Sequence, residues 1–226
     1  MSVIEFSRVE HSYGERPVLR GVDLVLGEGR IGIVGANGSG KSTLARMING
    51  LVTPDLGTVT VDGLDVTRQG REVRRRVGFV FTNPDNQIVM PTVSEDVAFT
   101  LRKSGLSKPD VAKRVASTLE RFGLAAHAEH PAHRLSGGQK QLLALASVLV
   151  AEPSVVVADE PTTLLDARNA RLIGQMLSSL EQQVVVVTHQ LELLDGFDRV
   201  VVIDEGRIVA DDTPDAALGA YRSLIA

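Results

Sequence analysis

The segment GANGSGKST, from Gly35 to Thr43, limits the possible fold of this 226-residue chain more than any other part of the sequence. It fits the pattern G-x-x-x-x-G-K-[ST], follows the apolar run RIGIV and precedes the helical pattern KSTLARMINGL. Glycines at this spacing let successive backbone N–H groups turn toward one anion, and the start of the helix adds partial positive charge. The segment therefore predicts a phosphate-binding loop between a buried strand and a helix.

Each residue of this loop has an expected part in holding a triphosphate. Lys41 is expected to reach the β- and γ-phosphates, and the Ser42 hydroxyl to coordinate Mg²⁺. The remaining positions supply backbone groups or the turn itself: Gly35, Ala36, Asn37, Gly38, Ser39, Gly40 and Thr43. The alternative is a glycine-rich turn that binds no ligand.

Two further apolar runs, SVVVADE (154–160) and QVVVVTH (183–189), are typical of buried strands in a parallel sheet. Asp159 and Glu160 end the first run, and His189 ends the second. Open α/β sheets bind their ligands at the carboxyl ends of the strands. We therefore expect Asp159 to bind Mg²⁺, Glu160 to activate an attacking water, and His189 to hold that water and Glu160 in line. Taken alone, the acids could cap a turn and the histidine could be structural.

The rest of the chain divides into strand-rich and helical parts. Near the N-terminus, segments alternate apolar and polar residues and break at glycines, as antiparallel strands do. A mostly helical stretch at 87–151 separates the first core strand from the other two. We expect one α/β domain over residues 1–226, in which 1–86 and 152–226 form a mostly parallel core sheet and an N-terminal antiparallel β subdomain, and 87–151 form an inserted helical subdomain.

Composition and charge argue against several functional classes. A net charge of −4 and a pI near 5.8 give no basic footprint, so nucleic acid is not an expected partner. With no cysteines, the chain has neither disulfides nor thiolate metal sites. Charged residues interrupt the N-terminal segment where a secretion signal needs apolar ones. The longest apolar run, Leu142 to Ala151, is about half of the roughly 20 residues that cross a bilayer, so work at a membrane requires an embedded partner.

A second glycine loop, LSGGQKQ (135–141), opens directly onto an apolar run and taken alone is an ordinary helix start. The order GANGSGKST, LSGGQKQ, VVVADEPTTLLD and VVVVTHQ resembles the ATP-binding cassette (ABC) ATPase family over essentially the whole chain. The resemblance implies a P-loop NTPase fold of the ABC nucleotide-binding type. It also implies ATP hydrolysis, with ATP and Mg²⁺ as cofactors.

In that family two subunits pack head to tail, so the resemblance implies a second copy or a paralogous ATPase subunit as partner. The second loop of one subunit then covers the γ-phosphate held by the Lys41 loop of the other. This loop comprises Ser136, Gly137, Gly138 and Gln139. A glycine pair at a helix start offers N–H donors and a positive dipole to an anion that arrives from outside.

The resemblance assigns two further residues. Asp166 matches the loop that crosses the dimer interface, although the family more often has a small residue where Leu164 or Leu165 stands. Tyr13 matches the aromatic side chain that stacks on adenine, a contact worth on the order of 1–3 kcal/mol by analogy with base stacking. The alternative for Tyr13 is half-buried packing between two strands.

One position departs from the family pattern. The resemblance implies a glutamine after VGFVF as a Mg²⁺ ligand, and this chain has Thr82 there. Threonine is shorter, so three arrangements stay open. Thr82 binds the ion through a water, Gln87 reaches in, or the ligand is absent.

The fold alone does not show whether such a domain serves in a transporter or in a soluble system. The stretch VFTNPDNQIVMPTVSEDVAF is similar to ATPase subunits of energy-coupling-factor (ECF) importers, which take up vitamins such as biotin or transition-metal ions such as cobalt and nickel. That similarity implies an integral membrane coupling subunit, a substrate-binding membrane subunit and a place at the cytoplasmic face of the cell membrane. The alternative is a soluble, nucleotide-switched clamp without a transport role.

Three histidines at 127, 130 and 133 suggest a metal site. Pro131 breaks the helix that would align them, and no carboxylate pattern completes a closed site. We expect a solvated loop here, with a metal site as the alternative.

Overall fold

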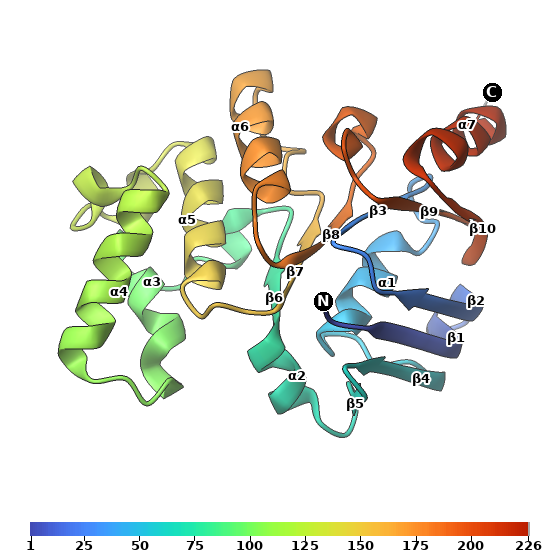
Figure 1. The fold of residues 1–226 in the computed structure, drawn as a ribbon, viewed down its shortest axis with the longest axis horizontal. Helices are drawn as coiled ribbons and strands as arrows, with labels where there is room; N and C mark the ends of the chain where they lie inside the picture. The colour runs from blue at the N-terminus through green and yellow to red at the C-terminus, as the bar shows by residue number, and fades with distance from the viewer. Residues whose placement is uncertain (226) are drawn as a thin grey trace. The chain divides into compact units, whose positions relative to one another are not determined.

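The structure is a computed structural model that describes residues 1–225. It comprises two compact units, whose elements are labelled in Figure 1. The first contains Met1–Phe79, Ser154–Glu160 and the chain from Met176 on, and the second contains Val80–Pro153 and Pro161–Gln175. The predicted helical stretch falls inside the second unit. The predicted domain limits stay a prediction.

An antiparallel sheet in the first unit has the strand order β2–β1–β4–β5. Its strands are β1 (Ile4–Tyr13), β2 (Arg16–Leu26), β4 (Leu56–Val61) and β5 (Leu64–Asp65). Val9 of β1 is buried beyond a register shift, and before that shift the buried residues Ile4 and Phe6 alternate with exposed Glu5. This period of two places one face of the sheet in the core and the other in solvent.

The core sheet of the same unit has the strand order β10–β9–β3–β8–β7–β6. Its strands are β3 (Arg30–Val34), β6 (Val77–Val80), β7 (Val155–Asp159), β8 (Gln183–Val187), β9 (Arg199–Asp204) and β10 (Arg207–Asp212). Strand β3 runs parallel to β8 and β9, and β7 runs parallel to β8. Every residue of β7 and β8 is buried, as is usual for parallel strands that are covered on both faces, and α1 packs against both strands. The predicted mostly parallel core and N-terminal antiparallel sheet are confirmed.

Helices of the first unit cover these sheets (Figure 1). Helix α1 (Lys41–Ile48) contacts β2 and β4 of one sheet and β7 and β8 of the other, and it buries an apolar stripe that includes Leu44 and Ile48. Helix α7 (Pro214–Ile225) packs on β9 and β10, and α2 (Gly70–Arg76) precedes β6. The position of α1 between the sheets fixes the loop that leads into it.

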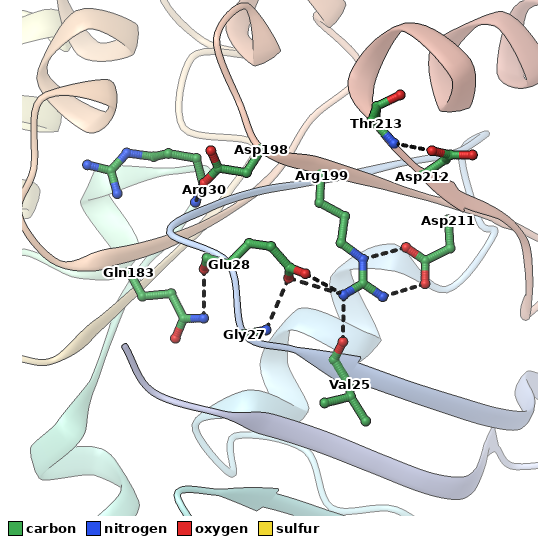
Figure 2. A network of polar contacts seen from close by, with 10 residues as sticks. All are labelled: Val25, Gly27, Glu28, Arg30, Gln183, Asp198, Arg199, Asp211, Asp212 and Thr213. Atoms are coloured by element: carbon green, nitrogen blue, oxygen red, sulfur yellow. Dashed lines mark hydrogen bonds and ion pairs between the residues drawn. The ribbon is translucent and has the colours of Figure 1, made fainter.

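Arg199 links the two sheets at their edges (Figure 2). Its guanidinium donates two hydrogen bonds of 2.6 Å to Asp211 of the neighbouring strand β10, and one of 2.8 Å to the Val25 carbonyl of β2. It also donates to both oxygens of Glu28, at 3.0 and 3.1 Å. The Asp211 hydrogen bonds are the largest cause of the raised pKa of Arg199, and burial opposes them only in part. Burial alone would raise the pKa of Glu28, but hydrogen bonds from the backbone of Gly27 and from Arg199 hold it below its ordinary value.

The second unit is helical. It contains α3 (Val93–Thr100), α4 (Lys108–Arg121) and α5 (Gly137–Leu149), and α6 (Ala167–Ser178) begins in it. Helices α4 and α5 both contact α3, and buried Asp96 of α3 accepts a 2.8 Å hydrogen bond from Ser147 of α5. Within residues 1–225, no helix has the length and apolar character needed to cross a membrane.

Candidate functional site

The parallel register brings three chain segments to one edge of the core sheet. Asp159 at the end of β7 pairs with Val187 at the end of β8, and Ile33 of β3 pairs with the same Val187. The loop after Val34 and the segment that leads to His189 therefore leave the sheet at this edge. Carboxyl ends of parallel strands are where such sheets bind ligands.

The loop between β3 and α1 is held close to neighbouring backbone. A side chain at Gly35 would place its Cβ 2.1 Å from the Ile203 carbonyl oxygen, so only glycine fits there. Gly40, the N-cap of α1, has a φ of 105° and no side chain with which to cap the first turn of the helix. Ala36, Asn37 and Gly38 are exposed, whereas Ser39 and Thr43 are buried. The loop thus offers an exposed tip and an uncapped helix start to an anion.

The first turn of α1 meets Asp159 of β7. The Ser42 hydroxyl donates a 2.8 Å hydrogen bond to one oxygen of Asp159, and Arg46 donates a 3.2 Å hydrogen bond to the other. Asp159 is only 1% exposed, so these partners balance a buried carboxylate. Ser42 and Asp159, both predicted as Mg²⁺ ligands, lie together, and their oxygen-only donor set fits Mg²⁺. Their role as ligands stays a prediction.

Glu160 connects the loop with the second predicted catalytic residue. One of its oxygens lies 2.7 Å from His189 Nδ1, and the other lies 4.0 Å from Lys41 Nζ, which also donates to the Ala36 carbonyl at 3.2 Å. Glu160 has a φ of 52°, a left-handed conformation that costs a non-glycine residue of the order of 1–3 kcal/mol. The structure thus brings Lys41, Glu160 and His189 together around one carboxylate.

Tyr13 lies at the end of β1 and is 52% exposed, so its ring is open to solvent. It makes an edge contact with His11, whose ring centroid is 4.8 Å away at an interplanar angle of 89°. An exposed ring held by such a contact suits stacking on a base. The adenine contact stays a prediction.

In the second unit, the predicted signature loop begins α5 as expected. Ser136 is the N-cap, and its Oγ accepts a hydrogen bond of 3.3 Å from Gln139 N. The Gln139 side-chain oxygen accepts one of 2.9 Å from Ser136 N, which completes a capping box. Gly137 has open space around it.

Asp166 lies behind this loop and is linked to it through Asn169 of α6. Asp166 accepts hydrogen bonds of 2.8 Å from the backbone N and 2.9 Å from the side-chain amide of Asn169. A Cβ on Gly138 would lie 2.5 Å from the Asn169 side chain, so this residue packs against the loop. The Asn169 backbone bond is the largest cause that holds the pKa of the Asp166 carboxyl below its ordinary value.

Thr82 is half-buried just after β6, and its part in Mg²⁺ binding stays a prediction. The structure disfavours the alternative that uses Gln87. The Gln87 side chain accepts a hydrogen bond from Phe81 N at 3.1 Å and donates one to the Ala144 carbonyl at 2.9 Å. A reach toward a metal ion would break both.

Sequence reasoning missed three polar residues next to the predicted ones. Arg46 pairs with Asp159, and Arg16 of β2 lies beside the phosphate loop, where a Cβ on Gly38 would be 3.2 Å from its guanidinium. Asn169 joins Asp166 to Gly138. The position of Arg46 one helical turn after Ser42 was a usable signal, whereas nothing in the spacing of Arg16 or Asn169 indicates these contacts.

Comparison with known proteins gives consistent matches. The family model described as "ABC transporter" matches residues 19–163. A putative ABC transporter ATP-binding protein of Deinococcus radiodurans is 53% identical over 97% of this chain and 97% of its own length. A biotin transport ATP-binding protein of Rhizobium etli is 44% identical over 99% of both chains. The solved structure of cbiO1 from Clostridium perfringens, described as part of the ABC transporter complex cbiONQ, superposes with a TM-score of 0.85 and 31% identity, covering 98% of this chain and 92% of that one.

Proposed function

Because the chain belongs to the ABC transporter family, which makes it an ATP-binding ATPase of a transport system, we propose that it is the ATPase subunit of an ECF-type importer. The name of the biotin transport relative favours a vitamin such as biotin as the cargo, with cobalt or nickel ions as the second candidate. The subunit works at the cytoplasmic face of the cell membrane, bound to a membrane coupling subunit and a substrate-binding membrane subunit. The cargo does not touch this chain.

The arrangement around Glu160 carries the part of the proposal that concerns ATP hydrolysis. His189 Nδ1 at 2.7 Å orients one carboxylate oxygen, and Lys41 Nζ at 4.0 Å faces the other from the phosphate loop. A water near this carboxylate gives a proton to Glu160 while its oxygen attacks the γ-phosphorus, and the bond from the γ-phosphorus to the bridging oxygen breaks so that ADP leaves with the electron pair. Lys41 and the uncapped first turn of α1 stabilise the negative charge.

Ser42 and Asp159 would hold Mg²⁺, with Thr82 as a further ligand through a water. When bound, the ion neutralises charge on the phosphate oxygens. Tyr13 stacks on the adenine ring and fixes the other end of the nucleotide.

Hydrolysis needs two subunits in this proposal. Ser136, Gly137, Gly138 and Gln139 of one subunit cover the γ-phosphate bound by the other, and Asp166 lies at the same interface. ATP closes the pair, and hydrolysis with phosphate release opens it. The helical unit passes this motion to the membrane partner.

A groove in the second unit supports a membrane partner. It has a volume of about 300 Å³ and is lined by Asp85, Ile88, Val89, Met90, Pro91, Ala132 and His133. Val89 is 62% exposed, so an apolar side chain stands open at this groove. Ile88 to Pro91 belong to the stretch that is similar to ECF subunits, and we place the coupling subunit there.

Glu160→Gln tests the catalytic assignment. Hydrolysis should fall at least about 10²- to 10⁴-fold because the amide cannot accept the proton. ATP binding and ATP-dependent pairing should remain, as measured by equilibrium dialysis and light scattering. Glu181→Gln, at an exposed position, is the control and should hydrolyse ATP normally. Normal turnover by Glu160→Gln would remove this residue from the role.

Purification from detergent-solubilised membranes tests the importer assignment. A tagged chain should bring down a protein with several membrane spans, and a variant with aspartate at Val89 should bring down less of it. Recovery of soluble macromolecular partners alone would favour the nucleotide-switched clamp instead.

A further inference from the structure

Two of the three histidines that precede the signature loop form a pair. His127 Nδ1 lies 2.9 Å from His130 Nδ1, and the ring centroids are 5.0 Å apart at an angle of 65°. His127 is half-buried at the end of a short 3₁₀ turn (Ala125–His127), whereas His130 and His133 are exposed. The segment was expected to be a solvated loop, and the ring contacts of His127 depart from that expectation.

The pair is connected to the signature loop through Gln139. His127 Nε2 lies 3.0 Å from the Gln139 side-chain nitrogen. The Gln139 side-chain oxygen is already used, because it accepts from Ser136 N in the capping box. An amide nitrogen only donates, so His127 Nε2 must be the unprotonated acceptor.

This requirement fixes the tautomer of both rings. A neutral imidazole carries one proton, so the proton of His127 is on Nδ1 and is donated to His130 Nδ1. His130 must then carry its own proton on Nε2. The contacts form a directed chain from Ser136 N to the Gln139 oxygen, from the Gln139 amide to His127, and from His127 to His130.

We propose that His127 is a positioning residue for the signature loop, which in its neutral Nδ1–H tautomer holds the Gln139 amide so that its oxygen closes the capping box on Ser136. The inference rests on the proposed function, in which this loop covers the γ-phosphate of a partner subunit. His130 supports the tautomer that Gln139 requires by accepting the Nδ1 proton, and His127 acts through Gln139 without touching the nucleotide.

Without His127, the Gln139 amide can turn over. Its nitrogen would then face the Ser136 N–H, the capping box would open, and the loop would sample other conformations before it meets the phosphate. The expected cost is that of one neutral hydrogen bond at a site used only in the closed pair. It should appear in kcat, with little change in ATP affinity of the isolated subunit.

Turnover of two variants tests the hydrogen bond itself. His127→Phe keeps a ring but loses the acceptor and should lower kcat roughly 3- to 10-fold. His127→Gln restores an acceptor oxygen at about the reach of Nε2 and should recover most of the rate. Ser94→Ala is the matched control, because it removes a 3.2 Å hydrogen bond to Glu129 in the same segment without touching Gln139, and it should leave kcat unchanged. A normal rate for His127→Phe, or equal losses in both His127 variants, overturns the proposal.

Long-range ¹H–¹⁵N NMR of the imidazoles gives a readout that is independent of catalysis. At about pH 8, where histidines are ordinarily neutral, His127 should carry its proton on Nδ1, and His130→Phe should shift it toward Nε2. A proton found on Nε2 of wild-type His127 overturns the proposal.

Two further controls address a bound metal ion and the catalytic role of Glu160. EDTA should leave the His127 and His130 signals unchanged, and a change would show that a metal ion holds the pair and overturn the inference. If Glu160→Gln hydrolyses ATP normally, the proposed catalytic assignment has failed, whereas the tautomer of His127 still decides the present inference.

Discussion

The phosphate loop before α1 and the signature loop before α5 share one design, a glycine-rich turn that opens a helix, yet they close that helix in different ways. Helix α1 begins after Gly40 with no side-chain cap. Helix α5 begins with a capping box in which Ser136 and Gln139 satisfy each other. The N-cap of the first loop therefore uses none of the helix's N–H donors through a side chain, whereas the capping box of the second uses two donors internally.

The two loops also differ in the charged groups that surround them. Lys41, Arg46 and the acids at the ends of the core strands surround the first loop with charge. The second loop contacts the amide of Asn169 at Gly138 and the imidazole of His127 at Gln139, and its one charged residue, Lys140, already pairs with Asp85 at 2.7 Å. A loop that carries a lysine beside a bare helix start suits a triphosphate, whereas a self-capped loop whose one cation is already paired suits a contact made after the nucleotide is bound.

The largest expected difference between the two loops is the loss of stability when one of their glycines is replaced by alanine. Gly35→Ala would place Cβ 2.1 Å from a backbone oxygen, whereas Gly137→Ala meets open space. We expect the first to lower the free energy of unfolding by about 3–5 kcal/mol or to prevent folding, and the second to change it by less than about 1 kcal/mol. Urea unfolding of both variants measures this, and similar losses would break the contrast between the loops.

Ser136→Glu places a charge where the second loop is expected to meet phosphate. If the site is completed by another subunit, as proposed, turnover should fall by about 100-fold or more, while ATP binding to the isolated subunit is spared. Steady-state hydrolysis and nucleotide titration measure the two effects, with Ser117→Glu at an exposed position of α4 as control. Equal loss of binding and turnover would contradict a site shared between subunits.

Arg46→Gln tests how much the ion pair with Asp159 beside the phosphate loop contributes to stability. Without nucleotide, it should lower the free energy of unfolding by about 1 kcal/mol, since Asp159 is buried but the Arg46 side chain is 41% exposed and solvent screens the pair. Excess Mg²⁺ and ATP should reduce the loss, because the ion supplies the missing positive charge. Thermal unfolding with and without Mg²⁺ and ATP decides this, with Arg75→Gln on α2 as control. A loss that nucleotide leaves unchanged would argue against Asp159 as an ion ligand.

Asn169→Ala has the smallest expected effect and probes the neutral support of the second loop. It removes the side-chain hydrogen bond to Asp166 but keeps the backbone one, which is the larger cause of the lowered pKa. The pKa of the Asp166 carboxyl should therefore rise only part of the way toward its ordinary value, and Arg168→Gln, a weaker cause, should raise it less. Because the folded pKa is lowered, the stability from this group is present above the ordinary pKa and is lost as pH falls through the folded value. A ¹³C titration of the carboxyl measures the shift, and an unchanged value in Asn169→Ala would exclude this support.

Much of the fold followed from sequence patterns because those patterns are local. Buried runs on both faces predicted β3, β7 and β8, and the glycine pattern predicted the loop before α1. The position of Asp159, Glu160 and His189 at strand ends was enough to place them at one edge of the sheet. Regular strand geometry converts spacing into proximity.

The remaining contacts depend on side-chain directions that spacing does not encode. Gln87 was a candidate metal ligand, but its amide binds the backbone at Phe81 and Ala144. Asn169 has no motif, and its contact with Gly138 depends on tertiary structure that brings this residue of α6 to the start of α5. The tautomer inferred for His127 follows only from three connected hydrogen bonds, those of Ser136 with Gln139, Gln139 with His127, and His127 with His130.

The left-handed backbone of Glu160 has an evolutionary consequence. Glycine adopts a φ of 52° without strain, so Glu160→Gly would raise the free energy of unfolding. It would also remove the carboxylate that contacts His189. At this position, selection for stability would favour glycine, whereas selection for the proposed catalytic role would favour glutamate. The protein keeps the more costly residue because its strands hold the strained turn in place.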